Sequence, residues 1–286
     1  MWTRAQIAED LSTLGLLPGS DVLAHASMKA IGEVNGGAAE VVEAFLEVLG
    51  EDGTLMVPTF HRTYADPADR RYPPETESEL IQLRAEVPPY DPHKPASSPL
   101  LMGVFSEAVR KHPKAFRSQH PGLSFAAIGA QAERFTERVP FDYPLGTHSP
   151  LNRLYDRNGQ VLLIGTHHSV NTSIHLAEVW ANVAYIHRSA HYKLETGEWG
   201  TMAGSPECSR GFGKIESLLR QSRILKEGYI GNAPSQRMSQ RQVISMAMAM
   251  LEGKGAALLC IDEDCRWCTL ARRMTATPDV SYAPIV

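Results

Sequence analysis

The stretch QVLLIGTHHSVNTSIHLAEVWAN, residues 160–182, carries the pattern that decides both the fold and the site. Residues 160–165 form a short apolar run that ends at a glycine, as buried strands often do. Residues 166–173 are polar, and the apolar spacing after them predicts a helix over 172–184. Because ligands of open α/β sheets lie beyond the carboxyl ends of strands, we expect chemistry in this loop and in the first helical turn.

His175 falls in the first turn of that helix if Asn171 or Thr172 caps it. The positive end of a helix disfavours an imidazolium, so the ring would stay neutral and able to accept a proton. Glu178 follows three residues later on the same face, where its carboxylate can orient or charge-balance the ring. A lone histidine in a helix is usually structural, but this placement favours a general base with an orienting carboxylate.

The rest of the chain alternates between strand and helix patterns. Apolar runs bounded by turn residues predict further strands at 21–27, 53–60, 123–129 and 256–262, and residues 191–199 predict a more exposed strand or hairpin. Helical spacing is found near the N-terminus (Ile7, Leu11, Leu14) and at 38–49, 98–112, 213–224 and 239–252. We expect one α/β domain over residues 1–286, with a central, mostly buried mixed sheet flanked by helices. The proline-rich segment 61–97 is predicted to be an irregular insertion that forms a substrate wall.

Composition excludes several classes of function. The 286 residues carry a net charge of −4 with both signs mixed along the chain, which gives no footprint for a nucleic-acid binder or a polybasic membrane anchor. No run of about 18 apolar residues predicts a membrane span. The N-terminus is typical of an amphipathic helix and not of a signal peptide. We therefore predict a cytoplasmic protein that binds neither nucleic acid nor membranes.

The chain has four cysteines, Cys208, Cys260, Cys265 and Cys268, and the last three lie within nine residues. Without a secretion signal a disulfide framework is a poor explanation, whereas CxxC spacing with one further thiol suits a structural zinc ion. The alternative is that Cys260 is a buried strand residue and the CxxC is incidental. A histidine-based metal site at His167, His168 and His175 is a weaker alternative, because the chain has no HExxH motif.

Polar segments next to core strands are candidates for anion binding. Residues 25–37, HASMKAIGEVNGG, follow a predicted strand, contain Ser27 and Lys29, and end in glycines before a predicted helix. Their backbone N–H groups could bind an anion. Residues 116–124 place Arg117, Ser118 and His120 before another core strand, and residues 143–155 precede a third. Taken singly, each of these segments could equally be a surface turn. Together they could form one cleft for a long phosphorylated cofactor.

In this order the segments resemble the aminoglycoside 3-N-acetyltransferase family. The resemblance rests on residues 19–60, 90–113, 116–129, 144–155 and the strand–helix stretch around VLLIGTHHSVNTSIHLAE. It covers most of the chain, and it is specific as a combination. One departure is Ala26-Ser27, where the family usually shows two serines after the first histidine.

The resemblance implies an α/β fold distinct from the common GNAT acetyltransferases. It also implies acetyl-CoA as donor and acylation of the 3-amino group of a 2-deoxystreptamine aminoglycoside, with His175 of TSIHLAE as the base. The coenzyme would lie along two loops, at His25, Ala26, Ser27, Met28, Lys29 and Ile31, and at Arg117, Ser118 and His120.

The chemistry of the reaction adds further expectations. A hydroxyl such as that of Thr172 could stabilise the developing oxyanion. Carboxylates should gather the ammonium groups of the substrate, and the candidate substrate-binding residues are Asp66, Asp91, Glu107, His168 and Glu178. Two other functions stay open: the same scaffold acylating another amine, for example in biosynthesis, and a non-catalytic protein in which His175 and the cysteines hold zinc.

Overall fold

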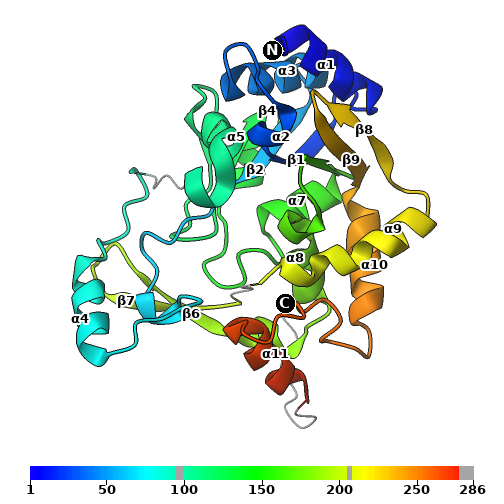
Figure 1. Ribbon diagram of the computed structural model, residues 1–286. Coiled ribbons are helices and arrows are strands. Elements are labelled where there is room, and N and C mark those ends of the chain that lie inside the picture. The colour runs from blue at the N-terminus through cyan, green and yellow to red at the C-terminus, as the bar shows by residue number, and fades with distance from the viewer. Residues whose placement is uncertain (95–98, 205–207, 277–286) are drawn as a thin grey trace.

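A seven-stranded mixed sheet forms the centre of the protein (Figure 1). The computed structural model describes residues 1–94, 99–204 and 208–276. In spatial order the strands are β3 (Phe116–Arg117), β4 (Phe125–Gly129), β2 (Thr54–Pro58), β1 (Asp21–Ala26), β5 (Gln160–Ile164), β9 (Ala233–Ser239) and β8 (Lys226–Ile230). The three central strands β2, β1 and β5 are parallel, and every outer pairing is antiparallel. The predicted α/β fold with a buried mixed sheet is confirmed.

The central strands are apolar on both faces because helices cover both faces. In β1, Leu23 points into one hydrophobic cluster, while Val22 and Ala24 point into the other. In β5, Leu162 and Ile164 belong to the second cluster and Val161 and Leu163 to the first. This alternation fixes the register, since a slip by one residue would exchange the two cores.

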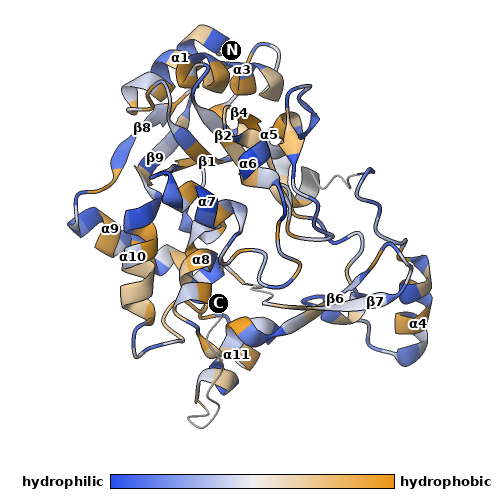
Figure 2. Cartoon of the chain, turned by 180° about the vertical axis from the view of Figure 1, so that it is seen from behind, coloured by the Kyte–Doolittle hydropathy of each residue, from blue (hydrophilic) through white to orange (hydrophobic). Residues whose placement is uncertain are grey.

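One face of the sheet packs against α1 (Arg4–Thr13), α3 (Ala38–Leu49) and α5 (Pro99–Lys111). The other face packs against α6 (Ala132–Thr136), α7 (Pro150–Asp156), α8 (Ser173–Trp180) and α10 (Gln240–Leu251). These helices carry both hydrophobic and hydrophilic residues (Figure 2), and their buried hydrophobic side chains belong to the two clusters. Phe45 and Phe105 meet in the first layer with ring centroids 5.6 Å apart and are both fully buried. Burying one such side chain stabilises the fold by about 2–3 kcal/mol.

A smaller two-stranded sheet lies away from the main sheet, next to α4 (Figure 1). Its strands are β6 (Ser189–Lys193) and β7 (Trp199–Ala203), which confirms the hairpin predicted around 191–199. Residues 61–94 pack on this hairpin through Tyr64, Tyr90 and Tyr192. We call residues 61–94 and 189–203 the outer lobe.

The predicted insertion 61–97 is less irregular than expected. It contains the short helix η1 (Pro67–Asp69) and the helix α4 (Glu77–Glu86). No side chain of α4 is buried, so its sequence lacks the apolar spacing from which a helix is predicted. Residues 95–97 of this segment, and residue 98 of the helix predicted at 98–112, lie outside the described residues.

The strand predicted at 256–262 is wrong. These residues form turns, and the apolar Leu258 and Leu259 are buried against the first hydrophobic cluster without any strand pairing. The turns lead to Cys265 and to helix α11 (Arg266–Ala276). An apolar run shows that a segment is buried but not its secondary structure. Among the described residues, no helix has the length and apolar character needed to cross a bilayer.

Candidate active site

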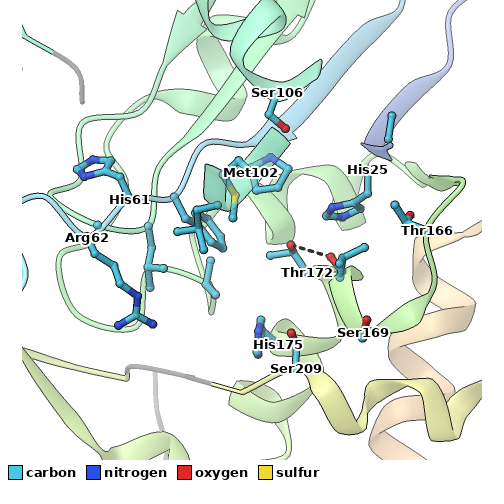
Figure 3. A pocket seen from close by; sticks show the side chains of 18 of the residues that line it. His25, His61, Arg62, Met102, Ser106, Thr166, Ser169, Thr172, His175 and Ser209 are labelled. Carbon is cyan, nitrogen blue, oxygen red and sulfur yellow. Dashed lines mark hydrogen bonds between the residues drawn. The ribbon is translucent and has the colours of Figure 1, made fainter. Parts of the chain in front are cut away.

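The carboxyl ends of the three parallel strands meet at one pocket (Figure 3). Its volume is about 340 Å³, and its wall includes His25 at the end of β1, His61 just beyond β2, and Thr166 just beyond β5. Gly165 makes the turn out of β5 with a positive φ of 59°, and a Cβ there would lie 2.2 Å from the Cβ of Ala30. The loop after β5 and the start of α8 both reach this pocket, at the edge of the sheet where the sequence predicts the site.

Helix α8 brings His175 to the pocket wall and holds its ring by a buried carboxylate. The Nδ1 of His175 lies 2.6 Å from Oε2 of Glu178, one helical turn along. The Tyr185 hydroxyl, on the short helix η3 (Ala184–His187), donates to Oε1 of the same carboxylate at 2.7 Å. Because Glu178 accepts the Nδ1 proton, Nε2 is the ring nitrogen left for a group in the pocket.

The start of α8 differs in detail from the expected cap. Thr172 occupies the N-cap position but makes no side-chain cap, and its hydroxyl contacts the carbonyl of Val170 at 3.4 Å (Figure 3). The side chain of Asn171 accepts from the amide of Ser173 at 3.3 Å. Thr172 and His175 both line the pocket, and the oxyanion role of the Thr172 hydroxyl stays a prediction.

The predicted coenzyme loop after β1 reaches the pocket only in part. His25 and Ala26 line the pocket. Ser27 caps the short helix α2 (Met28–Ile31) by accepting from the amide of Ala30 at 3.3 Å. The remaining residues of this predicted set differ in environment: Met28 is half-buried, Lys29 is exposed and Ile31 is in the core.

Arg117, Ser118 and His120 lie behind the wall of the pocket. Arg117 donates to the Ser124 hydroxyl at 2.6 Å, and burial lowers the pKa of its guanidinium. Ser118 accepts from the amide of Phe125 at 2.8 Å. Burial lowers the pKa of His120 to about 4, and its Nδ1 accepts from two backbone amides while Nε2 donates to a carbonyl. These three residues support the loop, and none of them lines the pocket.

The candidate substrate carboxylates are engaged elsewhere. Asp66 is buried and pairs with Arg84 at 2.7 Å, and Glu107 pairs with Arg110 at 2.6 Å. Asp91 is exposed and accepts from the backbone amide of His93. The remaining candidate, His168, is fully buried with Nε2 3.2 Å from Glu216, and burial lowers its pKa to about 4. Of the proposed substrate-binding set, only Glu178 reaches the site, through its contact with His175.

Several pocket residues were not singled out from the sequence. His61 is 2% exposed and neither of its ring nitrogens has a hydrogen-bond partner. Burial, with the nearby Arg117, lowers its pKa to about 3, so the ring is neutral at physiological pH. His25, which was predicted from the sequence as a coenzyme residue, is in a similar environment: burial, with nearby His168, lowers its pKa to about 3, and its Nε2 has no partner. The position of His61 directly after the strand 53–60 was the signal that could have found it.

The other lining residues come from separate segments of the chain, and Figure 3 shows how they surround the pocket. They include the polar side chains of Arg62, Ser106, Thr166, Ser169 and Ser209 and the apolar or aromatic ones of Phe60, Met102, Leu123 and Tyr192.

Cys208 meets the three cysteines of residues 260–268 beside this site. Their sulfur atoms all lie within 4.8 Å of one another, and all four thiols are free. Three of them are buried and Cys208 is half-buried. This is the only group of three or more potential ligands found in the described part of the chain, so the weaker histidine-based alternative gains no support from the geometry.

The family profile described as aminoglycoside 3-N-acetyltransferase matches residues 23–252, most of the chain. The chain belongs to the aminoglycoside 3-N-acetyltransferase family. It is 37% identical over 269 residues to aminoglycoside N(3)-acetyltransferase VII of Streptomyces paromomycinus, covering 88% of this chain and 92% of that protein.

Two solved structures relate the fold to ligands. The binary complex of AAC-IIIb with CoASH matches with a TM-score of 0.74 at 28% identity, covering 88% of this chain and 97% of the other. A histidine-to-alanine mutant of AAC(3)-IVa in complex with a gentamicin matches with a TM-score of 0.78 at 28% identity, covering 96% and 97%. The fold is therefore that of this acetyltransferase family and not the GNAT fold, and the protein is an acetyltransferase.

Proposed function

We propose that the protein transfers the acetyl group of acetyl-CoA to the 3-amino group of a 2-deoxystreptamine aminoglycoside, with His175 as general base. The observation that carries this proposal is the His175–Glu178 pair on the pocket wall of a chain in this family. The CoASH and gentamicin complexes of similar proteins support the donor and the acceptor class. The same chemistry gives the protein a role in antibiotic resistance.

The amine of the acceptor is mostly protonated and must lose a proton to attack. In the proposed step its nitrogen attacks the thioester carbonyl, a C–N bond forms, the C–S bond breaks and the coenzyme leaves as a thiolate. The Nε2 of His175 takes the proton from the amine, and Glu178 stabilises the imidazolium that results. The Thr172 hydroxyl, on the same wall, is the proposed donor to the developing oxyanion.

The coenzyme is proposed to enter along the loops near β1 and β3. His25 and Ala26 would contact its reacting end, while the exposed Lys29 would lie toward the phosphates. We assign Arg117, Ser118 and His120 to holding the neighbouring loop, since their polar atoms are largely used within the protein. We place the enzyme in the cytoplasm, where acetyl-CoA is available, with residues 1–286 acting as one domain.

A second candidate function, acylation of a less cationic amine, is favoured by one observation. None of the described side chains that line the 340 Å³ pocket is a carboxylate, and Arg62 lies on its wall. A polycationic aminoglycoside would therefore have to meet its carboxylates outside this pocket. Asp91, the exposed member of the predicted set, is the candidate for that contact.

We also propose that the four cysteines hold a structural zinc ion that takes no part in acetyl transfer. Four thiolates close a tetrahedral zinc site completely, which leaves no position for a substrate.

The decisive experiment is a thiol-release assay with acetyl-CoA and a panel of amines. The panel includes aminoglycosides with a free 3-amino group, matched compounds with that group blocked, and simple neutral or anionic amines. Turnover restricted to compounds with a free 3-amino group supports the proposal. Turnover of the blocked compounds contradicts the regiochemistry, and turnover of the simple amines alone favours the second candidate.

A further inference from the structure

The four-cysteine cluster lies beside two segments of the pocket wall. Cys208 directly precedes Ser209, which lines the pocket, while Cys265 and Cys268 stand at the start of α11. We infer that a zinc ion bound by the four thiolates fastens α11 to the chain at Cys208 and thereby sets the shape of this side of the pocket. The inference rests on the proposed zinc site and adds to it a role in acceptor binding.

The donor set fits zinc. Four sulfur ligands at about 2.3 Å from a tetrahedral zinc ion lie roughly 3.8 Å apart, and the four sulfur atoms here all lie within 4.8 Å of one another. The backbone amide of Cys260 points at the Cys268 sulfur at 3.4 Å. Hydrogen bonds of this kind orient metal ligands. Four buried or half-buried thiols gathered at one point are well explained by a common ligand.

Side chains from the turn and helix around the cluster brace the pocket wall. The Arg62 guanidinium, on the pocket wall, lies over the Trp267 ring at 5.2 Å, and Trp267 directly precedes Cys268. Asp262, two residues after Cys260, pairs with Arg210 at 2.7 Å and with Arg71 at 2.9 Å. One zinc ion would therefore hold Asp262 and Trp267 in place. Asp262 pairs with Arg210, next to the pocket residue Ser209, and Trp267 packs under Arg62.

Two arginine side chains of α11 also donate hydrogen bonds to backbone carbonyls, in the outer lobe and at Cys260. Arg266, in the first turn of α11, donates to the carbonyls of Ala68 and Arg70 in the outer lobe, both at 3.1 Å. Arg272 donates to the carbonyl of Cys260 at 2.7 Å. These bonds require the start of α11 to keep its position, and few apolar side chains of α11 are buried to hold it there. The zinc ion supplies that missing constraint.

The first experiment measures metal and thiols in protein purified under reducing conditions without added metal. We expect about one zinc ion per chain by native mass spectrometry, and its loss in C265S and C268S variants. Metal-free protein with two disulfides, or with four free thiols that do not take up added zinc, overturns the inference.

The second experiment tests the role of the ion in shaping the wall. Zinc is removed with a chelator in the presence of reductant, and amide hydrogen exchange is compared with that of the zinc-bound protein. We expect faster exchange in η4 (Arg210–Ile215) and α11, with α3 unchanged. Zinc removal that leaves exchange in η4 unchanged overturns the inference.

The third experiment uses a variant that keeps the thiols. Trp267→Leu removes the ring under Arg62. We expect it to retain zinc and to raise KM for the acceptor about two- to fivefold, with kcat little changed. The matched control is Leu270→Ala on the same helix, 40% exposed, which should change neither value. Equal KM values for the Trp267→Leu variant and the parent protein contradict the bracing role. Should no aminoglycoside be turned over, the proposed function fails, while metal content and exchange still decide this inference.

Discussion

The pocket has a helix side, formed by α8, and an opposite side, formed at the ends of the parallel strands. The two sides differ in whether their buried polar atoms have hydrogen-bond partners. On the helix side, His175 is held by Glu178, and Glu178 by Tyr185. At the strand ends, His61 and His25 are buried with ring nitrogens that have no partner within the described protein. Burying an unpaired polar group costs about 1–3 kcal/mol, so such groups persist where a ligand completes them. This contrast matches the proposed roles, proton transfer on the helix side and binding of the reactants at the strand ends.

The first prediction, with the largest expected effect on kcat, removes the proposed base from the helix side of the pocket. His175→Ala removes the base, and we expect kcat to fall about 10³-fold with the fold intact, measured by thiol release and by circular dichroism. The matched control, His93→Ala at an exposed site, should retain full activity. A His175→Ala enzyme within a few-fold of the parent would show that the base lies elsewhere.

The second prediction removes the charge that orients the base. Glu178→Gln keeps the size of the side chain but loses the carboxylate that accepts from Nδ1 of His175. We expect kcat to fall about 10²-fold with KM for both substrates nearly unchanged. Glu86→Gln, at the exposed end of α4, is the control. An equal fall in both variants would mean that the assay reports overall charge.

The third prediction tests the unpaired histidines through pH. Burial holds the pKa of His61 at about 3, whereas an unfolded histidine has a pKa of about 6.5. Below pH 6.5 the unfolded chain therefore binds a proton that the folded chain does not, and stability falls as the pH drops toward 3. At pH 5 this costs about 2 kcal/mol. In urea unfolding, His61→Phe should reduce the loss between pH 7.5 and 5 by that amount, and His93→Phe should leave it unchanged.

The fourth prediction, with the smallest expected effect, concerns the hydrogen bond from Tyr185 to Glu178 on the helix side of the pocket. Tyr185→Phe removes one donor to Glu178 while the ring keeps its place in the core. We expect Tyr185 to act as a positioning residue through Glu178, so kcat should fall about three- to tenfold while KM stays constant. Tyr155→Phe is the control, since its ring packs between Trp180 and the Arg241 guanidinium. A rise in KM without a change in kcat would assign Tyr185 to binding instead.

The helix side was also the more predictable side. The dyad is an i, i+3 pair, so its geometry follows from one helical turn and is readable from TSIHLAE. The four core strands at 21–27, 53–60, 123–129 and 160–165 were predictable because both of their faces are buried. In contrast, β8 and β9 were missed because their sequences are polar and contain Gly228 and Pro234.

Long-range contacts were harder to predict than this local pair. Asp66 and Glu107 are acidic residues in plausible positions, but their partners Arg84 and Arg110 decide where they point. Tyr185 carries no motif, and its role depends on the path of the chain after α8. The cysteines are the exception, since soft ligands with CxxC spacing marked a cluster that only the fold could bring together.

The local origin of the His175–Glu178 pair has a consequence for how the acceptor preference of this protein could be changed. His175 and Glu178 come from a single turn of α8, so the orientation of the proposed base is set within that turn and not by a contact from the outer lobe. The outer lobe is built from residues 61–94 and 189–203, which are separate from that turn in sequence. We therefore expect that replacing wall segments changes the acceptor preference while the helical turn that carries the proposed base stays the same.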